Sequence, residues 1–282
     1  MSRVDASDVS VIVAAYNNFQ WLRLCLEGLR LQSAQGFEIV IADDGSNSST
    51  VASLHDYIND HPQMHIRHAW HPDNGWRKNI ALNNAINLST RQYLLFIDAD
   101  CIPAPDWIAD HLSLRRPGTI IAGRRTTLAP WQSAEIEKLD TLPRNWWRKI
   151  LFSVITRFWR FPKRSRHGRV FRLPIFGGKG MLERPTGNLI GCNMGISRQD
   201  LLALNGFDER YLDAGLGEDI DICIRHQANG GKVIKAPHQA RMVHRYHLSN
   251  IGSSHRSANS LLLEQTRADR TIFTPFGIKK QS

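Results

Sequence analysis

The stretch Leu94-Leu95-Phe96-Ile97-Asp98-Ala99-Asp100-Cys101 decides the fold of this chain. A run of apolar residues followed directly by two carboxylates is typical of a strand buried on both faces of a parallel sheet. Ligands of open α/β sheets bind beyond the carboxyl ends of the strands. Two carboxylates there suit a divalent cation next to a phosphate, because such cations prefer oxygen ligands. The alternative is a strand end with solvated acids, since Asp is common in turns.

Strands and helices alternate on either side of this stretch. Residues 9–15 and 37–42 are rich in β-branched side chains and predict two further buried strands. Residues 21–31 and 77–88 carry apolar side chains at helical spacing. Repeated strand–helix units are typical of a parallel sheet covered by helices, so the sequence predicts an α/β fold. The first strand–helix turn lacks the glycine-spaced dinucleotide fingerprint, which argues against a nicotinamide cofactor.

The composition is that of a globular protein, with 42% hydrophobic residues. No stretch reaches the ~18 consecutive apolar residues that a membrane span requires. The N-terminus, MSRVDASDVS, lacks the apolar core of a signal peptide. The four cysteines are far apart and show no paired spacing, which argues against a zinc site or a disulfide framework. We therefore expect a cytoplasmic protein.

The formal net charge of +10 is concentrated in a basic, aromatic insert at residues 141–185. Between Thr141 and Leu182 there are eleven Lys or Arg residues and no Asp or Glu. Aromatic residues combined with Lys and Arg are typical of a helix that lies on anionic lipid. We expect the insert to bind the inner face of the membrane or a lipid-linked acceptor; the alternative is that its aromatic residues pack on the domain. The expected contact residues are Trp159, Arg157, Arg160, Lys163 and Arg164.

Six short motifs occur in a fixed order along the chain. They are VSVIVAAYNN (9–18), IADDGS (41–46), DAD (98–100), GCNMGI (191–196), GFDE (206–209) and GEDID (217–221). The ordered set resembles the family 2 glycosyltransferases with the GT-A fold. The last three motifs are similar to a galactosyltransferase-type C-terminal region that also occurs in bacterial chondroitin-polymerase-like enzymes.

The resemblance implies a GT-A-type, mostly parallel sheet flanked by helices in a single nucleotide-sugar-binding domain. Residues 1–248 are expected to form this domain, followed by a C-terminal tail at 249–282. Within the domain we expect a donor nucleotide-binding half at 8–123, the basic insert, and an acceptor and catalytic half at 186–248.

The family resemblance also implies a reaction. Its members transfer a sugar from a nucleotide diphosphate, usually a UDP-sugar, with inversion at the anomeric carbon, and we expect the acceptor to be a hydroxyl of a cell-surface glycan or of a lipid-linked molecule. The implied cofactor is Mn²⁺ or Mg²⁺. Asp100 is the expected direct metal ligand, and Asp98 is expected to contact the ribose or the hydrated metal. His244 is the expected third ligand, with His247 as the alternative, although histidine is also a common packing or surface residue.

The residues that follow the first two strands are expected to hold the donor nucleotide. By resemblance Ala14, Tyr16 and Asn17 contact the base and ribose, and Asp44 accepts a hydrogen bond from the uracil ring N–H. Arg77 is expected to reach the nucleotide or its diphosphate. The alternatives are that Tyr16 is a packing aromatic residue, that Asp44 is a turn acid, and that Arg77 is a solvated base at a helix start.

Asp219 is the expected catalytic base by resemblance, with Glu218 orienting acceptor or donor hydroxyls. Inverting transfer requires a base that takes the proton of the acceptor hydroxyl, and a carboxylate serves well. The alternative is that these acids simply favour a helix N-terminus.

Two other classes of protein compete with this interpretation. A nucleotidyltransferase that makes sugar nucleotides shares the first half of the pattern, but it carries a Gly-rich basic loop after the first strand, where this chain has Ala14-Ala15-Tyr16-Asn17-Asn18. A non-enzymatic nucleic-acid or membrane-binding protein would explain the basic insert. No nucleic-acid-binding module is recognisable, so we expect no nucleic-acid partner.

Overall fold

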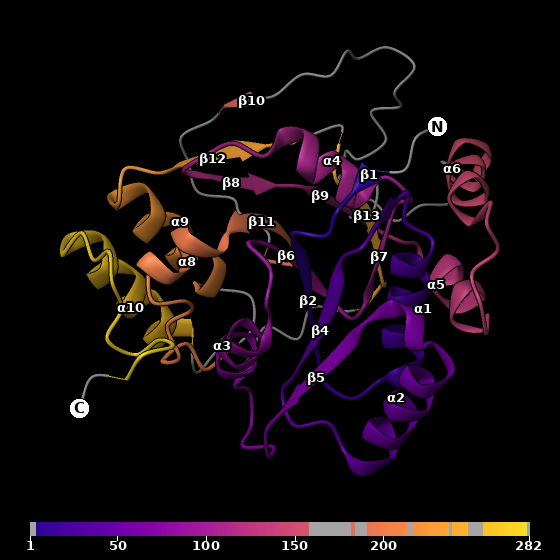
Figure 1. Ribbon diagram of the computed structural model, residues 1–282, viewed down its shortest axis with the longest axis horizontal. Coiled ribbons are helices and arrows are strands. Elements are labelled where there is room, and N and C mark those ends of the chain that lie inside the picture. The colour runs from indigo at the N-terminus through magenta and orange to yellow at the C-terminus, as the bar shows by residue number, and fades with distance from the viewer. Residues whose placement is uncertain are drawn as a thin grey trace.

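The computed structural model describes residues 4–157, 182–183, 191–213, 217–236, 239–247 and 256–280. An eight-stranded sheet lies at its centre, with helices on both faces (Figure 1). The strands of this sheet are β2 (Val9–Ala15), β4 (Glu38–Asp43), β5 (Ile66–Trp70), β6 (Tyr93–Asp98), β8 (Thr119–Ala122), β10 (Leu182–Glu183), β11 (Asn193–Ser197) and β12 (Lys232–Lys235). They are arranged in the order β10-β12-β8-β11-β6-β2-β4-β5.

Most neighbouring strands of this sheet are parallel. β5, β4, β2 and β6 form one parallel block, and β12 is parallel to β8. β11 lies antiparallel between β6 and β8, and β10 is antiparallel to β12. The predicted α/β fold with a mostly parallel sheet is confirmed.

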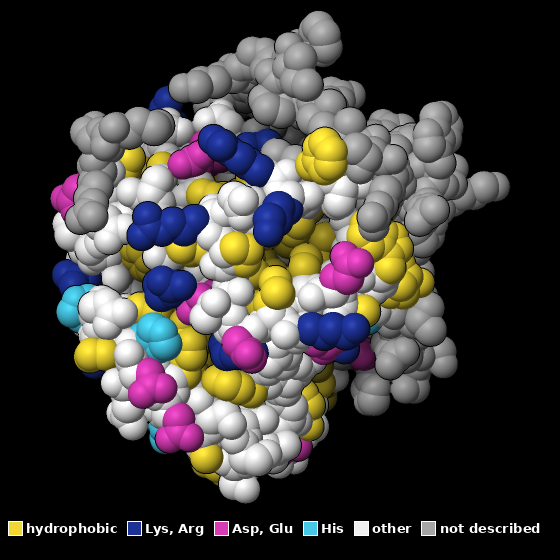
Figure 2. Space-filling view, turned by 90° about the vertical axis from the view of Figure 1, so that its right-hand side faces the viewer, with side chains coloured by type: hydrophobic (Ala, Val, Ile, Leu, Met, Phe, Trp, Pro, Cys, Tyr) yellow, Lys and Arg dark blue, Asp and Glu magenta, His cyan; other side chains and the backbone are white. Residues whose placement is uncertain are grey.

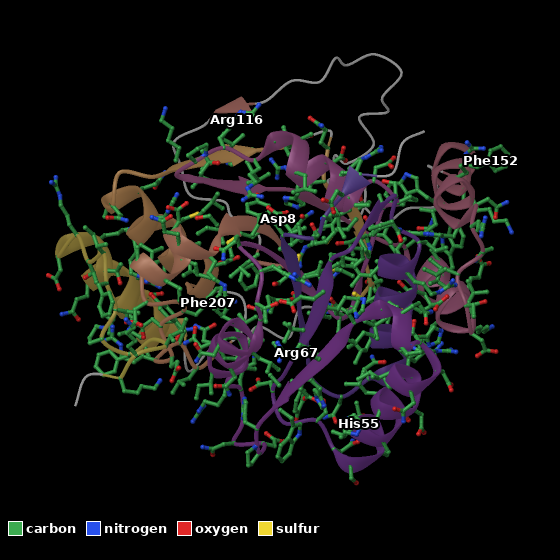
Figure 3. All side chains as sticks on the ribbon, viewed as in Figure 1. Asp8, His55, Arg67, Arg116, Phe152 and Phe207 are labelled. Carbon is green, nitrogen blue, oxygen red and sulfur yellow. The ribbon has the colours of Figure 1, made fainter. Side chains whose placement is uncertain are left out.

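Two apolar cores cover the two faces of the sheet. Side chains alternate between the faces along each strand, so that Leu95 and Ile97 belong to one core and Leu94 and Phe96 to the other. The first core contains α1 (Phe19–Arg30), α2 (Ser48–Asp60) and α4 (Trp107–Leu114). The second contains α3 (Lys78–Leu88), α8 (Arg198–Ala203) and α9 (Glu218–Ala228). In this core Phe207, which Figure 3 labels, packs edge-on against Phe96. A 3₁₀ turn, Pro62–Met64, precedes β5.

A second, three-stranded sheet lies beyond the end of β6. It consists of β7 (Cys101–Pro103), β13 (Arg241–His244) and β9 (Arg124–Thr127). β13 is antiparallel to β7 and parallel to β9, and this register places His244 opposite Cys101. A short parallel pair, β1 (Val4–Asp5) and β3 (Ala34–Gln35), completes the described strands.

The first part of the basic insert packs on the domain. Its helix α6 (Trp146–Arg157) joins a third apolar cluster, together with α5 (Pro130–Glu137), which precedes the insert, and in this cluster the buried Trp146 and Ile150 pack with Trp21 of α1. Phe152 of α6 is 67% exposed and points outward (Figure 3). On the side of the molecule that carries these helices, Lys and Arg side chains lie next to hydrophobic ones (Figure 2). The packing alternative thus holds for the start of the insert.

The described residues 256–280, which the sequence suggested as part of a tail, are docked on the domain. α10 (Arg256–Ala268) packs against α9, and Thr266 Oγ1 donates a hydrogen bond to Asp221 Oδ1 at 3.1 Å. Farther along, Thr274 Oγ1 donates to Asp208 Oδ2 at 2.6 Å. The polar composition of this segment therefore reflects buried hydrogen bonds as well as solvent exposure.

Candidate functional site

A cavity of about 450 Å³ opens at the carboxyl ends of β2 and β6. Its lining comes mainly from the end of β2 and the residues that follow it, from the turn before α3 and from the end of β6. The polar and small residues of this lining include Ala14, Tyr16, Asn17, Asp44, Lys78, Asp98, Asp100 and Arg245. Six of the residues proposed from the sequence thus line one cavity. This is the position at which open α/β sheets bind ligands.

Two asparagines shape the first wall of the cavity. Asn17 and Asn18 both have a φ of 52°, in the left-handed region that asparagine tolerates better than most residues. The Asn17 N–H donates to Ser46 Oγ at 2.7 Å, and Asn17 Oδ1 accepts from the Asn47 N–H at 3.0 Å. The loop after β2 is therefore fastened to the loop after β4. Tyr16 is 53% exposed, and its hydroxyl donates to Asp73 Oδ2 at 3.0 Å.

Asp44 is buried at the next wall. Its two carboxylate oxygens accept from the Arg77 backbone N–H at 2.9 and 3.1 Å, and His71 Nε2 lies 3.2 Å from Oδ1. Burial raises the pKa of Asp44, and the hydrogen bond from Arg77 only partly offsets this effect. The Arg77 guanidinium donates to the carbonyl of Trp76 at 2.9 Å and does not line the cavity. The contribution of Arg77 to the cavity is therefore its backbone N–H, which holds the Asp44 carboxylate in place.

The neighbouring Lys78 lines the cavity, whereas Arg77 does not. Its Nζ lies 2.8 Å from Asp98 Oδ1, and both side chains are about one quarter exposed. Lys78 begins α3, where a cation is unfavourable for the helix dipole. Because Lys78 is held there by an acid that faces a ligand cavity, it is placed to meet an anionic ligand.

Asp219 lies in an adjoining recess of about 10 Å³ that Ala14, Lys78 and Asp98 also line. Its Oδ2 accepts from the Gly191 N–H at 2.8 Å, and a Cβ at Gly191 would approach within 3.2 Å of Asp219 Cβ. Burial raises the pKa of Asp219, while the Gly191 hydrogen bond and the charge of Lys78 lower it in part. A carboxylate with a raised pKa beside a ligand cavity is suited to accept a proton.

Asp100 and His244 are brought together, as expected for metal ligands. His244 Nε2 lies 3.2 Å from Asp100 Oδ2, and His247 Nε2 lies 3.6 Å from the same oxygen. The oxygen of Asp100, the sulfur of Cys101 and a ring nitrogen of His244 all lie within 4.8 Å of one another. His244 is 5% exposed, and its Nδ1 has no hydrogen-bond partner within the described part of the chain.

The charges around Asp100 keep it ionised. Burial alone would raise the pKa of Asp100, but the hydrogen bond from His244 and the electrostatic effect of His244, His247 and Arg125 lower it to about 2. An ionised carboxylate next to imidazole nitrogens is a donor set that fits Mn²⁺, which accepts oxygen and nitrogen ligands. Burial raises the pKa of the Cys101 thiol well above its ordinary value, so this thiol is protonated in the metal-free protein.

The remaining sequence predictions lie at the limits of the described residues. Glu218 begins α9 and Arg157 ends α6, but their side chains lie outside the described part. Trp159, Arg160, Lys163 and Arg164 lie outside the described residues altogether. No helix in the described part of the chain has the length and hydropathy needed to cross a membrane.

Sequence reasoning missed three residues of the site. The sequence favours Arg77 over its neighbour Lys78, because the directions of two adjacent side chains at the start of a helix depend on the three-dimensional course of the chain. Arg245 lines the cavity, and its backbone N–H donates to the Asp100 carbonyl at 2.9 Å. Cys101 gave no signal beyond its position directly after Asp100.

Comparison with known proteins identifies the family. The model of glycosyl transferase family 2 matches residues 10–203, and the model described as the N-terminal domain of galactosyltransferase matches residues 179–248. Validoxylamine A glucosyltransferase of Streptomyces hygroscopicus subsp. jinggangensis is 25% identical over 270 residues, which cover 87% of this chain and 58% of that protein. The uncharacterized glycosyltransferase YfnE of Bacillus subtilis is 26% identical over 268 residues, covering 86% of this chain and 66% of that protein. The chain thus spans less than two thirds of the length of both relatives.

Solved structures share the fold. GalNAc-T7 superposes with a TM-score of 0.64 at 17% identity, covering 92% of this chain and 47% of that chain. The mannosyltransferase PcManGT from Pyrobaculum calidifontis superposes with a TM-score of 0.60 at 18% identity, covering 93% and 64%. The expected GT-A fold is confirmed by these neighbours. The model of glycosyl transferase family 2 matches more than half of the residues of this chain, and the chain therefore belongs to glycosyl transferase family 2.

Proposed function

We propose that this protein is a metal-dependent, inverting glycosyltransferase that moves a sugar from a UDP-sugar to a hydroxyl of a cell-surface glycan or lipid-linked acceptor. The observation that carries the proposal is the meeting of three groups at the end of β6. These are two adjacent candidate metal ligands, Asp100 and His244, a cation that lines the cavity, Lys78, and a half-buried carboxylate, Asp219. Together they match the three requirements of the reaction: charge balance at a diphosphate, a bound donor and a base.

The solved neighbours support a nucleotide sugar and a metal. The PcManGT structure is described as a complex with GDP-Man and Mn²⁺, and the GalNAc-T7 structure as one with UDP, GalNAc and Mn²⁺. The donor set of Asp100 and His244 suits the same ion or Mg²⁺. When bound, the cation balances the charge that develops on the leaving diphosphate.

The donor nucleotide occupies the 450 Å³ cavity in this proposal. Asp44 accepts from the ring N–H of uracil with a lone pair that the Arg77 N–H leaves unused, since a carboxylate offers about four acceptor sites. Tyr16, Asn17 and Ala14 contact the base and ribose. Asp98 orients the ribose, and Lys78 donates to the diphosphate in place of the contact first expected from the Arg77 side chain.

Asp219 takes the proton of the acceptor hydroxyl as that oxygen attacks the anomeric carbon. The Gly191 N–H donates to Asp219 Oδ2 and so orients the carboxylate that receives the proton. Direct attack by the acceptor from the face opposite the leaving diphosphate inverts the anomeric configuration. Glu218 orients sugar hydroxyls beside this base.

The basic insert is proposed to contact an anionic membrane surface or the anionic part of a lipid-linked acceptor. Its first helix, α6, is anchored by Trp146 and Ile150 and exposes Phe152. Neutralising Arg157, Arg160, Lys163 and Arg164 together should reduce sedimentation with anionic liposomes. Equal and negligible sedimentation of both proteins would exclude membrane binding.

Hydrolysis of a panel of UDP-sugars, with GDP-mannose for comparison, tests the main proposal. We expect release of UDP from at least one donor with Mn²⁺ present and none after chelation. Asp100→Ala should abolish turnover chiefly by losing metal-dependent nucleotide binding. Calorimetry that detects no UDP binding in the presence of Mn²⁺ would contradict the proposal.

A further inference from the structure

Cys101 is the residue of the metal-ligand group that the proposed reaction does not use. It is fully buried at the start of β7, and its Sγ lies 3.7 Å from Asp100 Oδ1. Its sulfur also lies within 4.8 Å of the Asp100 oxygen and the His244 nitrogen. The thiol is therefore an additional potential ligand for any cation that binds Asp100 and His244.

The strand register explains this position. Cys101 and His244 are directly opposite each other in the antiparallel β7–β13 pair. Residues opposite each other in such a pair point to the same face of the sheet, with their Cβ atoms about 4.5–5.5 Å apart. The unpartnered Nδ1 of the buried His244 leaves this ring free of a second hydrogen bond within the described part of the chain. Backbone pairing thus fixes the sulfur and the imidazole next to each other.

The chemistry of the three donors differs from that of a site built only for Mn²⁺ or Mg²⁺. Those ions favour oxygen ligands, whereas Zn²⁺ and Co²⁺ bind thiolate sulfur and imidazole strongly. One carboxylate, one thiolate and one imidazole leave a fourth position for water in a tetrahedral site. The sulfur of Cys101 therefore increases the affinity of the site for a thiophilic ion much more than its affinity for Mn²⁺.

We propose that Asp100, Cys101 and His244 form a binding site for Zn²⁺ and similar thiophilic cations, which exclude Mn²⁺ or Mg²⁺ from the same position. A metal–sulfur bond forms, the S–H bond breaks, and the proton passes to water; no electron is transferred. The competition with Mn²⁺ rests on the proposed function, because it requires that Asp100 and His244 also hold the ion used in sugar transfer. The sulfur ligation itself does not require that function.

Cobalt titration of the intact chain without any donor tests the sulfur ligand directly. Bound Co²⁺ with a thiolate ligand gives an intense near-ultraviolet charge-transfer band, which oxygen and nitrogen ligands alone do not give. We expect this band in the unchanged protein and its loss in Cys101→Ser. The matched controls, Cys25→Ser and Cys223→Ser, alter buried cysteines outside the ligand group and should keep the band.

Cys192 is a second control. Its Sγ accepts a hydrogen bond from Arg125 Nη1 at 3.4 Å and does not belong to the ligand group. Cys192 also hydrogen-bonds with the Cys101 thiol. Cys192→Ser should keep the band, because it leaves all three proposed ligands in place. A band that survives in Cys101→Ser, or that disappears only in Cys192→Ser, would overturn the proposal.

Two further measurements cover the case in which Cys101→Ser does not fold. In the unchanged protein, added Co²⁺ or Zn²⁺ should release bound Mn²⁺, and bound Mn²⁺ that stays in place while the cobalt band develops would put the two ions at different sites and overturn the shared site. Competition with a chromophoric chelator should show Zn²⁺ affinity falling about tenfold or more in Cys101→Ala, since even loss of an outer-shell partner costs about 10- to 100-fold. Absence of the cobalt band with intact Mn²⁺-dependent UDP binding would refute this inference alone, whereas loss of UDP binding with the band intact would refute only the proposed function.

Discussion

Lys78 Nζ lies 2.8 Å from Asp98 Oδ1, and the same two residues line both the large cavity and the recess that holds Asp219. This ion pair therefore connects the proposed nucleotide site with the proposed base. Asp98 comes from the end of β6, Lys78 from the start of α3 and Asp219 from the first turn of α9. Three segments far apart in the sequence meet at one point.

Lys78→Met should weaken UDP binding by about 10- to 100-fold, because a hydrogen bond to a charged group contributes about 1.5–3 kcal/mol. Arg77→Met is the matched control and should have a much smaller effect, since its backbone N–H, which holds Asp44, remains. Calorimetry with UDP and Mn²⁺ measures both. A larger loss of UDP affinity in Arg77→Met than in Lys78→Met would show that the Arg77 side chain, and not Lys78, contacts the diphosphate.

Asp219→Asn should retain UDP binding and lose sugar transfer by about 10²- to 10⁴-fold, the usual contribution of a general base. Asn has nearly the same shape and keeps an oxygen that accepts from the Gly191 N–H. Asp200→Asn, which alters an acid in the first turn of α8, is the control and should leave transfer unchanged. Near-normal transfer by Asp219→Asn would show that another group is the base.

The pH dependence of kcat/KM should reflect the raised pKa of Asp219, because kcat/KM reports the ionisation of the free enzyme. Asp219 accepts a proton only when it is ionised, so kcat/KM should fall as the pH drops through a pKa higher than that of an ordinary Asp. The charge of Lys78 lowers this pKa in part, so Lys78→Met should move the acid limb to still higher pH. Profiles of kcat/KM against pH check both statements, and an unmoved limb in Lys78→Met would contradict the coupling.

His244→Ala should reduce Mn²⁺ affinity more than His247→Ala. His244 Nε2 is closer to Asp100 Oδ2, at 3.2 Å against 3.6 Å, and the His244 side chain is 7% exposed against 51% for His247. A buried, oriented ring loses less freedom when it binds a metal than an exposed one. Mn²⁺ titration followed by electron paramagnetic resonance measures the two affinities. The reverse order would make His247 the third protein ligand.

Arg225→Met should lower the free energy of unfolding by about 3–5 kcal/mol, because it leaves the buried carboxylate of Asp221 without its cation. Both side chains of this pair are 1% exposed, and Arg225 also donates to the Leu204 and Gly206 carbonyls. Arg116→Gln is the surface control and should change stability little. Denaturant unfolding measures both variants, and a small loss in Arg225→Met would mean that water reaches Asp221.

The fold could be predicted because its signals are local. The apolar run at residues 94–97 and the β-branched run at residues 9–15 became the central strands β6 and β2, paired in parallel. The docking of residues 256–280 could not be read in this way. It depends on hydrogen bonds such as Thr274 to Asp208, which join positions far apart in the sequence.

The candidate site was partly readable for the same reason. The Asp-Ala-Asp motif can be recognised from the sequence because it follows a buried strand. Which of Arg77 and Lys78 places its side chain in the cavity depends on the conformation of the chain at the start of α3. The spacing of the four cysteines indicated no zinc site. Cys101 and His244, which are 143 positions apart, became neighbours only because β7 and β13 pair in a register that no local pattern reveals.

The sequence by itself determined the strands, the ordered motifs and hence the family, because hydrophobic periodicity and short motifs are properties of neighbouring residues. The tertiary structure decided which acids and bases share a cavity. Lys78 meets Asp98 and Asp219, and Asp100 meets His244 and Cys101, because the packing of strands and helices fixes distances that sequence separation does not. The two carboxylates at the end of β6 thus have different neighbours: Asp98 is paired with Lys78, and Asp100 lies with Cys101 and His244.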